Sequence, residues 1–273
     1  MSADSQYNKL PRPQGELQHL YGPQVHILSH PWAMSMLAQL CAKGTHQPRA
    51  NDLVKALYDW LLTELASREF TVNPTQSATR MAADHPAAGV YEGELLDRDQ
   101  QVVVVDIARA GIIPGMRFFD GLNRLLHPSG VRQDHVFMNR VTNEAGEVTG
   151  VDLSGSKIGG PITESTVLIP DPMAATGSSI AEVLRLYREE VEGTPKKLVV
   201  IHLIVTPEYL QRITSKFPNT IIYAIRLDRG LSAPDVLQTM PGERWSEEKG
   251  LNQSQYIVPG GGGFGEVMNN AWV

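Results

Sequence analysis

The sequence predicts an α/β protein in which a parallel sheet is flanked by helices. Short apolar segments such as residues 101–106 (QVVVVD) and 165–170 (STVLIP) are typical of buried parallel strands. They alternate with segments whose apolar residues recur at helical spacing, and a chain of this kind forms a parallel sheet with right-handed crossovers. With 273 residues, 42% of them hydrophobic, the chain is long enough for one large core, so we expect a single domain over residues 1–273.

The first part of the chain, residues 1–75, is predicted to be a helical region that precedes the alternating part. Pro31 suits the first turn of a helix that runs to about Lys43 and ends at Gly44. After a weakly patterned segment, residues 71–94, in which we expect one or two strands and a loop, the alternating part begins. A second helix is indicated by leucines four residues apart, Leu53, Leu57, Leu61 and Leu65.

The alternating part supplies the strands of the sheet and the loops that leave them. Ligands of such sheets bind outside the carboxyl ends of the strands, so polar residues at these ends are candidate site residues. The expected core strands are residues 101–106, 135–140, 165–170, 198–205 and 220–225.

The most informative segment is residues 171–179 (DPMAATGSS), which connect a predicted strand to a predicted helix. Small residues allow an anion to approach the first amides of the helix, whose dipole favours negative charge. Asp171 offers two acceptor oxygens, which suit a pair of neighbouring hydroxyl groups. Considered alone, the segment fits an ordinary helix cap equally well. The acid, the threonine and the two serines together favour a sugar-phosphate site.

Two arginines follow other predicted strands. Arg109 comes just after the first core strand and Arg140 ends the next one. A guanidinium binds phosphate oxygens in pairs and keeps its charge, so beside a phosphate loop the two arginines indicate a second, more highly charged phosphate group. Gly111 is expected to let backbone amides approach that group.

Charge and hydropathy exclude several classes of protein. The chain has 24 basic and 30 acidic residues, a net charge of −6, which predicts no nucleic-acid partner. No segment approaches the ~18 apolar residues of a membrane span, so we expect no membrane partner and a cytoplasmic location.

Two glycine-rich segments flank the later strands. Residues 141–164 contain few large apolar groups and predict a protruding β-arm, which serves dimer exchange or covers the site, or is simply flexible. The C-terminal segment contains glycines spaced as in a dinucleotide-binding motif, but only eight residues follow Gly265, too few for that fold. Its interleaved apolar residues indicate instead a loop around a flat heterocyclic base.

Four motifs, in order, resemble those of the uracil phosphoribosyltransferase family, which has the type I phosphoribosyltransferase fold. Residues 171–179 look like DPMLATGGS, the loop that binds phosphoribosyl diphosphate (PRPP). Residues 108–111 (ARAG) are similar to LRAG, and Arg140 resembles the arginine of MYRNEE, both PRPP contacts in the family. Residues 250–266 (GLNQSQYIVPGGGGFGE) are similar to the uracil loop, GLNxxGYIxPGLGDAGD.

The resemblance implies a pyrimidine-salvage enzyme that converts uracil and PRPP to UMP and diphosphate with Mg²⁺. It also implies a homodimer or higher homo-oligomer. Arg109, Arg140 and Asp171 are the implied catalytic residues. The implied PRPP contacts are Arg109, Ala110, Gly111, Arg140, Asp171, Pro172, Met173, Ala174, Ala175, Thr176, Gly177, Ser178, Ser179 and Gly263, and the implied uracil contacts are Tyr256, Ile257, Gly262, Gly263 and Phe264.

The chain departs from the family pattern at two places. Gly263 and Phe264 stand where the family has Asp and Ala, while Glu266 aligns with the second Asp of that motif. Residues 232–249 form an insertion before the base loop, 250–266. Two alternatives therefore remain: a phosphoribosyltransferase of altered base specificity, and a non-catalytic regulator that binds PRPP or a nucleotide.

Overall fold

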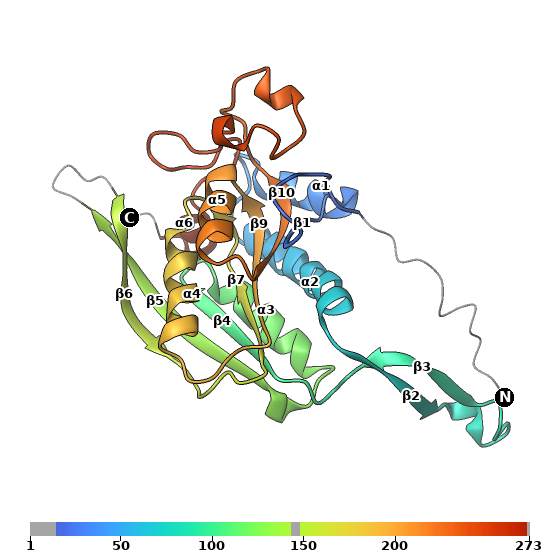
Figure 1. The fold of residues 1–273 in the computed structure, drawn as a ribbon. Helices are drawn as coiled ribbons and strands as arrows, with labels where there is room; N and C mark the ends of the chain where they lie inside the picture. Colours follow the sequence, from blue (N-terminus) through green and yellow to red (C-terminus); the bar gives the residue numbers. More distant parts are fainter. Residues whose placement is uncertain (1–14, 143–147, 272–273) are drawn as a thin grey trace.

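An eight-stranded sheet lies at the centre of the protein, in a computed structural model that describes residues 15–142 and 148–271, without the side chains of 140–142 and 148–151. All neighbouring strands are parallel except β5 and β6, which confirms the predicted α/β class (Figure 1). The strand order is β1 (Val25–Ile27), β10 (Thr220–Leu227), β9 (Lys197–Val205), β7 (Thr166–Pro170), β4 (Val102–Ala108), β5 (Val131–Thr142) and β6 (Val148–Lys157), with the short β8 (Met173–Ala174) also paired to β9.

Helices cover both faces of the sheet and form two apolar cores. The first core contains side chains from α1 (Pro31–Leu40), α2 (Arg49–Glu69), α3 (Ile112–Asn123) and α6 (Phe264–Asn269), and the second contains those from α4 (Ser178–Glu189) and α5 (Pro207–Lys216). Strand β4 serves both cores: Val102 and Val104 join the first, Val103 and Val105 the second. This alternation fits a strand buried on both faces, which is why its sequence is continuously apolar.

The N-terminal region is partly helical, as predicted, but it also contains strands. The two predicted helices are α1 and α2. The prediction of a helical region over 1–75 misses β1, an edge strand of the main sheet, while β2 (Val72–Ala78) lies in the segment 71–94 for which strands are expected. A three-residue strand is too short to produce a hydrophobic period. The strands expected in residues 71–94 are β2 and β3 (Val90–Leu96), an antiparallel ribbon that projects from the body (Figure 1).

The arm expected at residues 141–164 is an antiparallel hairpin with different limits. Its first strand, β5, already starts at Val131, and pairing with β6 begins at His135 opposite Lys157. The strand predicted at 135–140 is therefore the middle of β5 rather than a separate element. Residues 143–147 of the predicted arm lie outside the described residues.

The segment 232–249 packs against the body through specific contacts. It contains two short 3₁₀ turns, Val236–Gln238 and Trp245–Glu247. The Arg229 guanidinium donates to the carbonyl of Thr239 at 2.8 Å and forms an ion pair with Glu248, also at 2.8 Å.

In the described parts of the chain, no helix has the length and hydropathy needed to cross a lipid bilayer.

Candidate active site

A cavity of about 970 Å³ lies at the carboxyl ends of the central strands. Its wall includes the end of β4 with Arg109, part of β5, the β7–α4 connection, and the C-terminal loop. Open parallel sheets bind ligands at this edge, where loops from neighbouring strands converge. The cavity thus brings together segments that lie more than 150 residues apart in the sequence.

Asp171 is the first residue after β7 and is largely enclosed. Its amide donates to the carbonyl of Ile201 at 2.9 Å, which fixes the backbone against β9. No described residue donates a hydrogen bond to its carboxylate, and burial raises the pKa of Asp171 to about 7. An enclosed carboxylate without protein donors is suited to accept hydrogen bonds from a ligand that carries hydroxyl groups.

The backbone at Asp171 is further held by His202, a buried residue of β9. His202 Nδ1 lies 2.6 Å from the Asp171 carbonyl oxygen, and Nε2 lies 2.6 Å from the hydroxyl of Tyr209. Burial lowers the pKa of His202 to about 4, so the ring is neutral at physiological pH. Since a carbonyl only accepts, Nδ1 carries the proton and Nε2 accepts from Tyr209. The histidine therefore orients the loop.

The predicted phosphate loop, residues 171–179, continues into α4 through a left-handed turn. Gly177 has φ +78°, and Ser178 begins the helix. The Thr176 and Ser178 hydroxyl oxygens lie 3.1 Å apart, and Thr206 donates to the Ala175 carbonyl at 2.7 Å. These contacts place two hydroxyl groups beside the first helical amides, the arrangement expected of a phosphate site.

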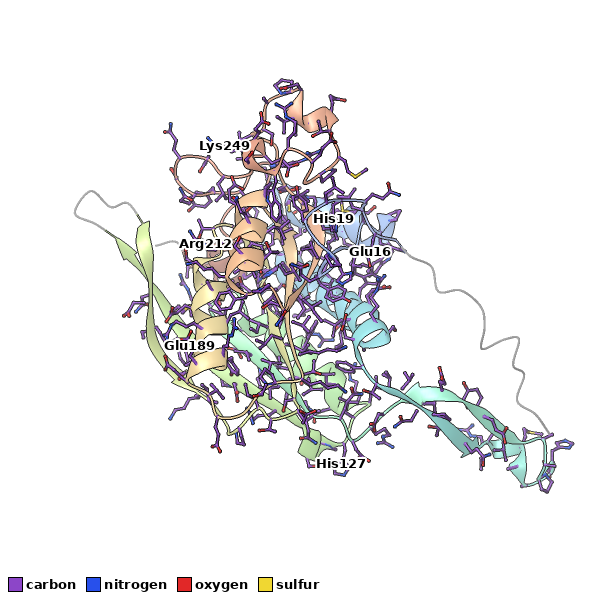
Figure 2. All side chains as sticks on the ribbon, viewed as in Figure 1. Glu16, His19, His127, Glu189, Arg212 and Lys249 are labelled. Atoms are coloured by element: carbon purple, nitrogen blue, oxygen red, sulfur yellow. The ribbon has the colours of Figure 1, made fainter. Side chains whose placement is uncertain are left out.

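Arg212 is a site residue that the sequence did not reveal. Its side chain is exposed on α5 (Figure 2). It lines the cavity and donates from Nη1 to the Ser178 hydroxyl. Its sequence signal is weak, because an arginine between Tyr209 and Ile213, both buried, looks like any solvent-facing residue of an amphipathic helix. Only the packing of α5 against α4 brings its charge to the predicted phosphate loop.

The structure places the two predicted arginines differently. Arg109 is exposed, lines the cavity together with Ala110, and its guanidinium makes no hydrogen bond or ion pair with a described residue. The peptide bond between Ala108 and Arg109 is cis. Arg140 lies in β5 directly after Asn139, which lines the cavity, but the Arg140 side chain is outside the described residues.

Two predicted PRPP contacts do not lie on the cavity wall. Gly111 is buried, its amide donates to the Ile107 carbonyl at 2.9 Å, and a Cβ at this position would lie 2.7 Å from the Ile107 nitrogen. The glycine is thus required for close packing, and its amide is already used. Pro172 is buried, and its carbonyl accepts from Leu203 and Ile204 of β9. All other predicted PRPP contacts with described side chains line the cavity: Arg109, Ala110, Asp171, Met173, Ala174, Ala175, Thr176, Gly177, Ser178, Ser179 and Gly263.

The predicted base loop forms the other side of the cavity. An ion pair between the partly buried Arg226 and the buried Asp228 holds it: Asp228 accepts from the Gly260 amide at 2.8 Å, and Arg226 donates to the Gly260 carbonyl at 3.0 Å. Phe264 is 3% exposed and packs in the first core, so it anchors the loop to the body of the protein. It also lines the cavity. The predicted base contacts Tyr256, Ile257, Gly262, Gly263 and Phe264 all line the cavity.

Comparison with known proteins gives one consistent family. A family model described as uracil phosphoribosyltransferase matches residues 27–242. Proteins of that name are similar over nearly their whole length: the one from Pyrobaculum islandicum is 29% identical over 244 residues, 89% of this chain and 97% of that protein, and the one from Thermosipho africanus is 27% identical over 245 residues, 90% and 98%. A third, from Thermococcus sibiricus, is 29% identical over 179 residues, 64% of this chain and 62% of the relative.

One solved structure extends the comparison to the fold. The AQ2163 protein from Aquifex aeolicus superposes with a TM-score of 0.67 at 23% identity, over 91% of this chain and 99% of that one. The fold of most of the chain is therefore shared with a solved protein.

Proposed function

Because the chain belongs to the uracil phosphoribosyltransferase family, we propose that it transfers the phosphoribosyl group of PRPP to uracil, giving UMP and diphosphate. One observation carries the proposal: a single cavity contains a phosphate loop, an enclosed carboxylate, an unpaired arginine and a glycine-rich loop. These groups match, in order, the 5′-phosphate, the ribose hydroxyls, the diphosphate and the base. The cytoplasmic location and the homo-oligomer remain predictions.

In the proposed reaction the uracil N1–C1′ bond forms as the C1′–O bond to diphosphate breaks. The bonding electron pair leaves with diphosphate, and the N1 proton is released to solvent. Since C1′ becomes more positive and diphosphate more negative on the way, catalysis depends on holding the partners in line and on stabilising the leaving charge.

Each part of the cavity has a role in that reaction. Asp171 accepts hydrogen bonds from the ribose hydroxyls, and residues 174–179 with Arg212 bind the 5′-phosphate. Arg109, and Arg140 by resemblance, neutralise the diphosphate. The main chain at Ile257 and Gly262 forms hydrogen bonds with the polar edge of uracil, while Tyr256 and Phe264 contribute apolar surface.

The donor set of the cavity fits a Mg²⁺ ion that arrives with PRPP. Among the described residues, no three His, Cys, Asp or Glu side chains form a metal cluster, and the carboxylates on the described wall belong to Asp171 and Glu266. Mg²⁺ retains several waters and binds substrate phosphates, so this set suits a metal held mainly by PRPP, with Asp171 contributing through water. When bound, it supplies positive charge to the leaving diphosphate.

The test is a panel of bases assayed with PRPP and Mg²⁺. We expect equal amounts of UMP and diphosphate from uracil and much slower turnover of hypoxanthine, adenine and cytosine. Turnover of another base only would contradict the uracil assignment and favour altered specificity. Binding of PRPP without turnover of any base would indicate a regulator.

A further inference from the structure

Gly263 and Glu266 occupy one place in the cavity wall. A Cβ built on Gly263 would overlap the Oε2 atom of Glu266 and lie 2.6 Å from its Cδ. The Glu266 carboxylate therefore fills the space in which a side chain of residue 263 would begin. Both residues line the cavity, and Glu266 is partly exposed to it.

A role in capping α6 does not account for this position. Gly263 is the N-cap of α6 and Glu266 is the third helical residue, the position from which a glutamate can accept from the N-cap amide. No described group donates a hydrogen bond to the Glu266 carboxylate, the Gly263 amide included. Its oxygens are thus available to a ligand.

The position of this carboxylate relates to the departure of the chain from the family motif. The motif carries an aspartate where this chain has Gly263. A glycine there makes room for the longer side chain of Glu266, whose carboxylate lies where the Cβ of residue 263 would be. Gly263 has φ −83°, a conformation open to any residue, so backbone conformation does not require glycine.

We propose that Glu266, rather than residue 263, supplies the acidic group of the base loop and accepts a hydrogen bond from the substrate. An ionised carboxylate only accepts, so the partner is a donor, either an N–H of the base or a hydroxyl of the ribose. The inference rests on the proposed function and deepens it by assigning a binding residue. The kinetic constant that changes identifies the donor: the KM for uracil reports the base, and the KM for PRPP reports the ribose.

The direct test removes the negative charge of Glu266 and then introduces a carboxylate at residue 263 instead. Glu266→Gln keeps the size of the side chain and is expected to raise one of the two KM values about tenfold or more, because hydrogen bonds to charged groups contribute ~1.5–3 kcal/mol. Gly263→Asp alone is expected to lower kcat/KM, since two carboxylates then compete for one place. Gly263→Asp combined with Glu266→Ala is expected to recover activity to within about threefold of the unmodified protein.

The control is Glu192→Gln, which removes an exposed carboxylate that does not line the cavity and is expected to leave both KM values unchanged. The inference is overturned if Glu266→Gln has the KM values of the unmodified protein, or if the double variant is no more active than Glu266→Ala. Folding of each variant is followed by thermal melting, and Glu266→Gln alone decides if Gly263→Asp does not fold. Absence of UMP formation by the unmodified protein would overturn the proposed function and this inference with it.

Discussion

The phosphate loop and the base loop form opposite sides of one cavity but are held in different ways. The phosphate loop, residues 171–179, follows directly on β7 and is fixed by the neighbouring strand of the sheet, β9, through Ile201 and His202. The base loop, 250–266, follows the irregular segment 232–249 and depends on the Arg226–Asp228 pair and on Glu208, which accepts from the Gly250 amide at 2.9 Å. The phosphate loop is therefore one continuous turn held by the neighbouring strand β9, while the base loop depends on contacts from β10 and α5.

The largest expected effect is at the phosphate side. Asp171→Asn replaces an acceptor-only group by one that offers a single acceptor, and we expect kcat/KM for PRPP to fall more than about 100-fold, since two hydrogen bonds from hydroxyls to a charged group are weakened. The fold should be retained, because no described residue depends on this carboxylate. Steady-state kinetics and a thermal melt check both statements, and normal PRPP use by a folded variant would remove Asp171 from the site.

Breaking the support of the base loop should produce the next largest effect. Arg226→Ala leaves Asp228, which is 2% exposed, as an unpaired buried charge, at a cost of about 3–5 kcal/mol in the free energy of unfolding. We expect the KM for uracil to rise more than the KM for PRPP. Denaturant unfolding and separate substrate titrations measure the two quantities. An equal rise of both KM values would show that the two loops do not behave independently.

The pKa of Asp171 gives a pH dependence confined to the phosphate side. With a pKa of about 7, Asp171 loses its charge as the pH falls from 8 to 6, so we expect the KM for PRPP to rise about tenfold over this range. His202, with its pKa of about 4, stays neutral throughout and adds nothing. Any pH dependence of the KM for PRPP that remains in Asp171→Asn comes from other ionisable groups, including those of PRPP. An identical slope in both proteins would contradict the assignment.

The raised pKa of Asp171 also makes the stability of the protein depend on pH, but stability falls as the pH rises, whereas PRPP binding improves. The folded-state pKa of Asp171 is raised above its ordinary value of 3.8, so the native state binds this proton more tightly than the unfolded chain. The contribution of Asp171 to stability is therefore greatest at low pH and is lost as the pH rises through about 7. Asp171→Asn should melt at a higher temperature than the unmodified protein at pH 8, with a smaller difference at pH 5.

Arg212 tests whether the phosphate side extends to α5. We expect Arg212→Ala to raise the KM for PRPP about tenfold, the loss of one charge-assisted contact to phosphate, and to leave the KM for uracil unchanged. Arg188→Ala, an exposed arginine on α4 away from the cavity wall, is the matched control. A KM for PRPP that changes equally in both variants would assign the effect to general charge.

The smallest effect is expected at a glycine of the base loop. Gly262 has φ +78° with open space around its Cβ position, so Gly262→Ala adds backbone strain of roughly 1–2 kcal/mol without a collision. Gly265, also with open space but inside α6, is the control, because Gly265→Ala should be neutral or slightly stabilising. We expect the KM for uracil to rise several-fold in the first variant only, as measured by titration of uracil.

The features that the sequence predicts well are those encoded in short continuous segments. Most strands, most helices and the 171–179 turn follow from hydrophobic period and turn composition, which are local signals. Strand β1 has three residues and gives no period, and Arg212 and Glu266 reach the cavity only through the packing of α5 and the turn before α6. Gly111 looked like a ligand-binding glycine because a requirement for close packing selects the same residue type as a close approach to phosphate.

A crystal structure of the protein with UMP is the decisive experiment, because UMP spans both sides of the cavity. We expect the phosphate at the amides of residues 176–179 and at Arg212, the ribose hydroxyls at Asp171, and the uracil ring at Ile257 and Gly262. UMP bound with its phosphate away from residues 171–179, or with its base outside the 250–266 loop, would show that the proposed site is wrong.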